Sequence, residues 1–91
     1  MVAADAIYHL ASEVVLRDAD QVCFHTANGC VVRFNEVGYA TLLHFVEPNT
    51  LSNVAHAISR LFSADYAEVD SDVHAFVADL ITKQILIPST P

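Results

Sequence analysis

The spacing of hydrophobic residues along the chain changes at one point, Phe34-Asn35. Before this junction polar and apolar residues alternate, a period of two that is typical of half-buried strands. After it, apolar residues recur every three or four positions, which is the period of an amphipathic helix. The pattern therefore predicts three strands, at residues 13–17, 21–26 and 30–34, followed by helices.

The segment Ala27-Asn28-Gly29 predicts a β-hairpin between the second and third strands, with its glycine at positive φ. A three-residue loop would pair Phe24 with Val32 and gather their side chains on one apolar face of the sheet. The same register places Cys23 and Cys30 on different faces, which argues against a disulfide between them.

Three helices are predicted after the junction, and each begins at a residue whose side chain suits the N-cap. Asn35, Thr50 and Asp65 can each accept a hydrogen bond from a free N–H of the first turn. Pro48 is expected to end the first helix, and the third is expected to end near residues 83–84. The core-facing stripes are Tyr39, Leu42, Leu43 and Val46, then Leu51, Val54, Ala55, Ile58 and Phe62, then Val69, Val73, Phe76, Val77 and Leu80.

The order of elements predicts an α+β fold: a three-stranded antiparallel sheet followed by a three-helix bundle, in a winged-helix-like arrangement. Residues 85–87 form a short final extended segment, which Pro88 is expected to stop. The length of 91 residues suits one domain with one hydrophobic core. We expect a single domain over residues 1–91, a folded core over about 13–87, and mobile ends that include the tail 89–91.

Composition narrows the classes of function. Hydrophobic residues make up 54% of the chain, so part of the apolar surface is expected to stay exposed and to meet a partner. Four basic residues against eleven acidic ones leave a formal net charge of -7. Such a surface repels phosphate backbones and anionic membranes, so neither nucleic acid nor a membrane is an expected partner. The chain has no signal-peptide pattern, and a cytoplasmic location is expected.

The residues give catalysis little support. The two cysteines lack a C-x-x-C spacing, and no serine lies in a nucleophile-elbow motif. Two glycines cannot make a glycine-rich phosphate loop, and the histidines form no ligand pair at metal-binding spacing. We therefore expect no enzyme activity, no cofactor and no metal site. The histidines concerned are His9, His25, His44, His56 and His74.

Several segments together resemble the PqqD-like family, also called RiPP recognition elements, which bind leader peptides of ribosomally made, post-translationally modified peptides. The resemblance covers residues 13–87. It departs from the family pattern at Glu47-Pro48, where the family often has Asp-Gly, at Asn53, where it has Glu, and at Gln84-Ile85, where it usually has a glycine. The segments that carry it are Phe34-Asn35-Glu36-Val37-Gly38, the threonine-led 50–58, the aspartate-led 72–80 and the apolar 85–87.

The resemblance implies a mechanism of strand addition, in which an extended leader peptide pairs with the free edge of the third strand. Peptide side chains would enter a groove between that strand and the third helix. Phe76 would form an apolar floor, while Asp72 and Asp79 would receive a basic or hydroxyl group. The alternative for these helix residues is plain core for Phe76 and a solvated face for the aspartates. The expected peptide-binding residues are Cys30, Val31, Val32, Arg33 and Phe34 on the strand and Asp72, Phe76, Asp79, Leu80 and Lys83 on the helix.

The resulting hypothesis is a non-catalytic protein that binds a precursor peptide and presents it to a separate maturation enzyme. Lasso-peptide processing, with a leader peptidase, and pyrroloquinoline-quinone synthesis, with a radical enzyme, both fit this hypothesis. Two alternatives come from other classes. Asp70-Ser71-Asp72 suggests a carrier protein with phosphopantetheine on Ser71, although that fold should be all helical. The winged-helix arrangement suggests a DNA-binding protein, which the acidic charge opposes.

Overall fold

The computed structural model describes residues 6–89, which form an α+β fold with two small sheets and three helices. The first sheet contains β2 (Val14–Arg17), β3 (Val22–His25) and β4 (Val31–Arg33) in that order, all antiparallel. This sheet and its three strands agree with the prediction. Because β3 lies between the other two strands, β2 and β4 are the edges of the sheet.

A second sheet was not predicted. It places β1 (Ile7–Leu10) between β5 (Asn49–Thr50) and β6 (Leu86–Pro88), with both pairings antiparallel. The expected folded core of residues 13–87 therefore omitted a central strand at its beginning. Pro88, expected to stop the last extended segment, is part of β6, and the expected tail lies outside the described residues beyond Ser89.

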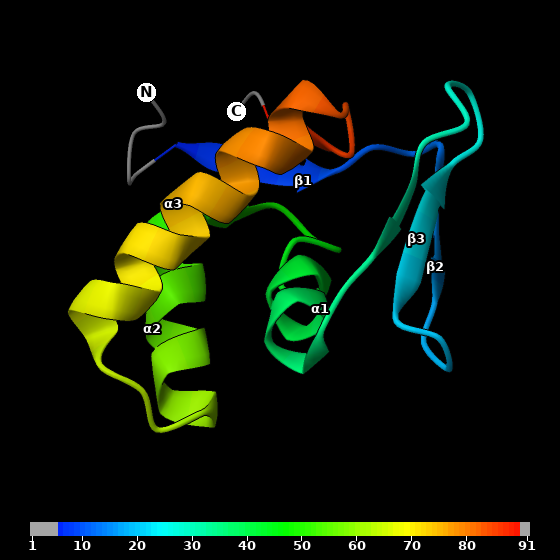
Figure 1. Cartoon of the computed structure of the whole chain (residues 1–91). Helices are drawn as coiled ribbons and strands as arrows, with labels where there is room; N and C mark the ends of the chain where they lie inside the picture. Colours follow the sequence, from blue (N-terminus) through cyan, green and yellow to red (C-terminus); the bar gives the residue numbers. More distant parts are fainter. Residues whose placement is uncertain (1–5, 90–91) are drawn as a thin grey trace.

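The helices are α1 (Glu36–Leu43), α2 (Leu51–Leu61) and α3 (Tyr66–Thr82). The three predicted N-caps are confirmed, since the side chains of Asn35, Thr50 and Asp65 accept hydrogen bonds from backbone N–H groups three residues later. Figure 1 shows α2 and α3 packed together on one side, the β2–β3 hairpin on the other, and α1 between them.

The first helix is shorter than predicted. It ends at Leu43, and a turn follows that buries Phe45 completely and lets its carbonyl accept a hydrogen bond from Leu10 N in β1. Tyr39 is buried as expected, but Leu43 and Val46, which were predicted to face the core, are exposed. The burial of Phe45 thus ends the helix several residues before Pro48.

The predicted hairpin register is wrong by one residue. Cys23 pairs with Val32, and Phe24 pairs with Val31, so the loop has four residues, 26–29. Gly29 has the expected positive φ of 75°. The physical reason is a set of side-chain bonds in the loop: His25 Nδ1 accepts from the N–H groups of residues 27 and 28.

The shifted register changes which side chains face the core. Cys23 is fully buried on the inner face with Val32, whereas Phe24 lies on the outer face beside Val31. Both cysteines are free thiols, although they now share the inner face of the sheet. The argument against a disulfide from opposite faces therefore does not hold. Burial raises the pKa of the Cys23 thiol, which keeps it protonated and a poor nucleophile at neutral pH.

Candidate functional site

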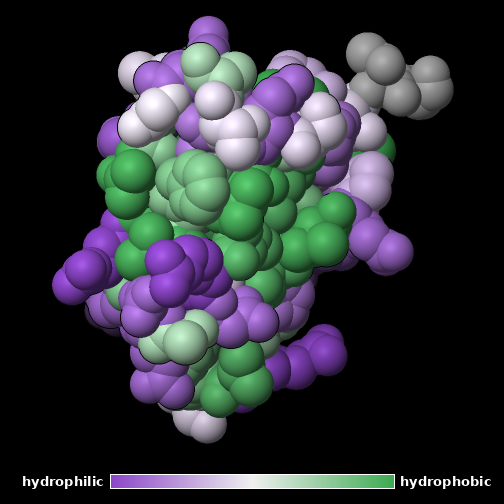
Figure 2. Space-filling view, turned by 90° about the vertical axis from the view of Figure 1, so that its right-hand side faces the viewer, coloured by the Kyte–Doolittle hydropathy of each residue, from purple (hydrophilic) through white to green (hydrophobic). Residues whose placement is uncertain are grey.

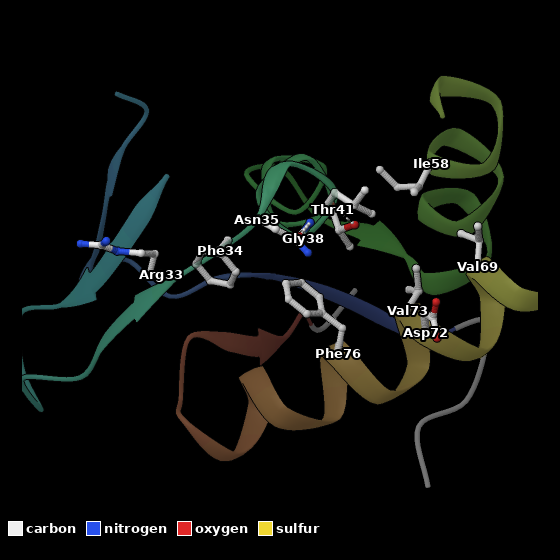
Figure 3. Close-up of a pocket in the computed structure, with 11 residues that line it drawn as sticks. Arg33, Phe34, Asn35, Gly38, Thr41, Ile58, Val69, Asp72, Val73 and Phe76 are labelled. Atoms are coloured by element: carbon white, nitrogen blue, oxygen red, sulfur yellow. Dashed lines mark hydrogen bonds between the residues drawn. The ribbon is translucent and has the colours of Figure 1, made fainter. Parts of the chain in front are cut away.

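A cavity of about 380 Å³ opens where the end of β4 meets the three helices. Most of its lining is apolar, and the charged groups on it are Arg33 and Asp72. Figure 3 shows these side chains converging from β4, α1, α2 and α3, with the Arg33 guanidinium pointing away from the others. The lining residues are Arg33, Phe34, Asn35, Val37, Gly38, Thr41, Ile58, Val69, Asp72, Val73 and Phe76.

The junction between β4 and α1 is built by Phe34, Asn35 and Gly38. Asn35 Oδ1 accepts a hydrogen bond of 2.7 Å from Gly38 N and so starts the helix. A Cβ atom at Gly38 would lie 3.1 Å from that oxygen and 3.5 Å from the Phe34 side chain. The absence of a side chain at this position therefore lets the capping amide and the phenyl ring both lie against the first turn, which explains why the motif needs a small residue there.

Phe76 joins α3 to the end of β4. Its ring lies edge-on to the ring of Phe34, with centroids 5.7 Å apart and an interplanar angle of 68°. Phe34 also packs against Tyr39, at 6.2 Å between centroids. Such aromatic pairs contribute about 0.5–1.5 kcal/mol beyond their buried area. Phe76 is only partly buried, so its ring both supports the core and forms part of the cavity wall.

The free edge of β4 has a defined hydrogen-bonding pattern. His25 N donates to Cys30 O, and Phe34 N donates to Gln21 O. The main-chain N–H and C=O groups of the even-numbered residues in this part of the chain therefore point toward β3. Main-chain groups alternate in direction along an antiparallel strand. The N–H and C=O groups of Val31 and Arg33 consequently point away from β3, toward the open edge of the sheet.

The β3–β4 loop contacts the carboxyl end of α3. Asn28 Nδ2 donates to Lys83 O at 3.3 Å, and Asn28 Oδ1 accepts from Cys30 N at 2.8 Å. Helix α3 ends at this loop, and Gln84 follows it at a positive φ of 62°, a left-handed conformation that is common just after a helix. The strand and helix are thus joined at this loop and again at Phe34 and Phe76.

The structure brings together some of the predicted site residues and separates others. Arg33, Phe34, Asp72 and Phe76 all line the cavity, whereas Asp79 and Lys83 do not. Asp79 instead forms an exposed ion pair of 2.6 Å with Lys83. Among the others, Val31 is 67% exposed at the edge, Cys30 and Val32 are half-buried on the inner face, and Leu80 is buried in the core.

Sequence reasoning missed the part of the cavity that comes from the first two helices. Val37 and Thr41 of α1 and Ile58 of α2 face it together with the first turns of α3. Ile58 had been assigned only to the core stripe. An available signal was Gly38, because a residue without a side chain in a helical first turn allows the preceding residues to pack closely against that turn.

Within residues 6–89, the structure contains no group of three histidine, cysteine or acidic side chains that could hold a metal ion. None of the helices in that range is long and apolar enough to cross a membrane.

Comparison with known proteins identifies the fold. A lasso peptide synthetase B1, solved in complex with the leader peptide, superposes with a TM-score of 0.75 at 16% identity, covering 89% of this chain and 98% of the other. The PqqD truncation of Methylobacterium extorquens PqqCD, described as a stand-alone RiPP recognition element, superposes at 0.74 with 20% identity, covering 96% and 95%. No curated protein sequence matches the chain.

The family comparison is more specific than these structural likenesses, because it reads the sequence itself. The model of the family described as coenzyme PQQ synthesis protein D matches residues 8–86. This range begins within β1 and ends within β6, so it includes both sheets and all three helices. The chain therefore belongs to the PqqD family.

Proposed function

We propose that this chain is a non-catalytic recognition protein, which binds the leader region of a ribosomally made precursor peptide and presents it to a separate maturation enzyme. The observation that carries the proposal is the open edge of β4 directly beside the cavity that the end of β4 forms with the three helices. Membership of the PqqD family supports it, as does the fold shared with a protein solved with a leader peptide and with a RiPP recognition element.

The edge of β4 supplies the general affinity. A peptide strand paired with it would exchange hydrogen bonds with the main-chain groups of Val31 and Arg33. The strand has no proline, and its one charged side chain, Arg33, leaves the edge accessible. Since β4 has only three residues, the edge can hold a short extended segment and needs the neighbouring cavity for selectivity.

The cavity provides the selectivity among peptides. Its volume of about 380 Å³ lies near the lower end of small-ligand sites, so it suits a few peptide side chains. Alternate residues of an added strand point to the same face, and those on the inner face would pass Phe34 and Phe76 before reaching it. Asp72 is exposed at the rim, where its carboxylate can accept a hydrogen bond from a basic or hydroxyl side chain.

The two alternatives have less support. A carrier protein needs its serine at the start of a helix, whereas Ser71 lies inside α3. Duplex DNA would require a basic surface, but the chain has four basic residues against eleven acidic ones. The chemistry of maturation is therefore assigned to another protein, either a leader peptidase or a radical enzyme.

The test of strand addition is a proline at the open edge. Val31→Pro removes an N–H group that points away from β3, so the ladder inside the sheet remains while one hydrogen bond to the peptide is lost and the ring blocks close pairing. We expect titration with a fluorescent synthetic leader peptide to give at least about tenfold weaker binding.

Val31→Thr is the matched control, because it keeps both the β-branched shape and the N–H group. It should bind the leader peptide within about twofold of the wild type. Circular dichroism must show that both variants keep their helices. Tight binding by a folded Val31→Pro variant would rule out β4 as the receiving strand.

A further inference from the structure

The side chains on the outer face of the β2–β3–β4 sheet, which lies on the other side of the sheet from the core, have no role in the mechanism above, apart from Arg33, which also borders the cavity. We infer that this face is the docking surface for the maturation enzyme, and that the enzyme meets it with an apolar patch bordered by carboxylates. The inference rests on the proposed function, because it concerns the protein to which the bound leader peptide is delivered.

A row of apolar side chains crosses this face. Val15 of β2, Phe24 of β3 and Val31 of β4 are directly opposite one another in the ladder, so their side chains point to the same side. Val15 is 40% exposed and Val31 is 67% exposed, while Phe24 is half-buried between them. Figure 2 views the molecule from the side of the β2–β3 hairpin and shows hydrophobic surface across the middle of this side.

The next row on the same face of the sheet is basic at both ends. Arg17, Val22 and Arg33 are opposite one another, which places two of the four basic residues of the chain on this face. Within residues 6–89, Arg33 forms no ion pair, and Arg17 has only an exposed contact of 3.1 Å with Asp20. In a chain of net charge -7, this local pair of arginines favours a partner surface that carries carboxylates.

The face is continuous with the proposed peptide site. A leader strand added to β4 becomes the fourth strand of the sheet, and its side chains alternate between the two faces. The inward set would lie toward the cavity, while the outward set would extend the row of Val15, Phe24 and Val31. An enzyme on this face would therefore contact the chain and the leader peptide together, and should bind the loaded complex more tightly than the free chain.

Two substitutions of exposed hydrophobic residues by glutamate distinguish an effect on this surface from the effect of the same change elsewhere on the molecule. Val15→Glu changes β2, which is two strands away from the open edge of β4. Leu61→Glu is the control, at a position 62% exposed at the end of α2. The binding partner is the purified leader peptidase or radical enzyme encoded beside the gene for this chain, measured with and without the synthetic leader peptide.

We expect Val15→Glu to weaken binding of the enzyme at least about tenfold and Leu61→Glu to change it less than twofold. Both variants should bind a fluorescent leader peptide within twofold of the wild type. Arg17→Glu, at a position whose side chain is 64% exposed, should also weaken binding of the enzyme. This variant tests the surface if Val15→Glu does not fold.

The inference is overturned if Leu61→Glu weakens binding as much as Val15→Glu, or if neither Val15→Glu nor Arg17→Glu weakens it. It is also overturned if the wild-type chain does not bind the enzyme at all. A homodimer that Val15→Glu dissociates in light scattering would show that a second copy covers this face instead. Failure of the leader peptide to bind the wild type would count against the proposed function alone. The docking surface is tested separately, by the binding of the enzyme to the chain without the peptide.

Discussion

Tyr39 connects α1 to the turn between β2 and β3. Tyr39 is buried, and its hydroxyl donates a partly buried hydrogen bond of 2.5 Å to Asp18 Oδ1, 21 residues back along the chain. Burial, together with the neighbouring Asp18 carboxylate, raises the pKa of Tyr39 to about 12. The same ring packs on Phe34, so this one side chain helps to place the end of β4 beside the cavity.

The raised pKa of Tyr39 predicts a loss of stability in alkali. Below pH 10 the phenol is protonated in both folded and unfolded chains, so its contribution to the free energy of unfolding is constant. Between pH 10 and about 12 the unfolded chain loses this proton first, and the free energy of unfolding should fall by on the order of 2 kcal/mol. Denaturant titrations at pH 8 to 12 measure this fall.

Tyr39→Phe should remove that component of the pH dependence, and at pH 8 it should cost about 1.5 kcal/mol for the lost hydrogen bond to a carboxylate. Tyr66→Phe is the matched control, since Tyr66 is partly exposed and stacks on His56 at the surface. An equal alkaline fall in Tyr39→Phe and the wild type would show that the Tyr39 hydroxyl does not titrate late.

Among the elements, α3 has two functional halves. Its first half borders the cavity through Val69, Asp72, Val73 and Phe76. Its second half packs Leu80 into the core and presents the Asp79–Lys83 ion pair to solvent. An exposed ion pair of this kind contributes little free energy, about 0–1 kcal/mol. Selection by charge should therefore depend on the first half of the helix.

Asp72→Asn and Asp79→Asn test this division, because they make the same change in the two halves of one helix. With a leader peptide that carries lysine or arginine, Asp72→Asn should weaken binding about three- to tenfold, and Asp79→Asn less than twofold. Calorimetric titration at low and moderate salt would measure both. Equal losses in the two variants would place charge recognition along the whole helix, as the sequence had suggested.

At the scale of the whole molecule, the second sheet joins three segments that are far apart in the sequence. β1 pairs with β5, which immediately precedes α2, and with β6, which follows α3. Leu10 N and Ala11 N also donate to the carbonyls of Phe45 and Ile85. Strand β1 therefore holds the helices in place behind the cavity, although none of its four residues lines the cavity.

Removal of residues 1–10 tests this role. The deletion takes away β1 and leaves both β5 and β6 without their neighbour, so we expect the free energy of unfolding to fall by at least about 3 kcal/mol. Thermal unfolding followed by circular dichroism should become broad and less cooperative. An unchanged, sharp transition in the shortened chain would show that residues 13–87 form the stable core without β1.

Three particular features mark the limit of what the sequence predicted. The hairpin register depended on His25 Nδ1 bonds within the loop, and alternation of polar and apolar residues does not encode such bonds. The end of α1 depended on burial of Phe45 against β1. The two-residue strand β5 carries no periodic pattern at all, because it exists only through its pairing with β1.

The sequence by itself determined the three strands of the β2–β3–β4 sheet, the presence of the three helices with their N-caps, the core stripes of α2 and α3, and the family resemblance at the junction after β4. These features depend on interactions between residues a few positions apart, which spacing and residue type reveal. Only the tertiary structure decided the second sheet, the faces of Cys23 and Phe24, and the meeting of Phe34 with Phe76 at the cavity. Each of these joins segments distant along the chain, so it depends on the path of the backbone as a whole.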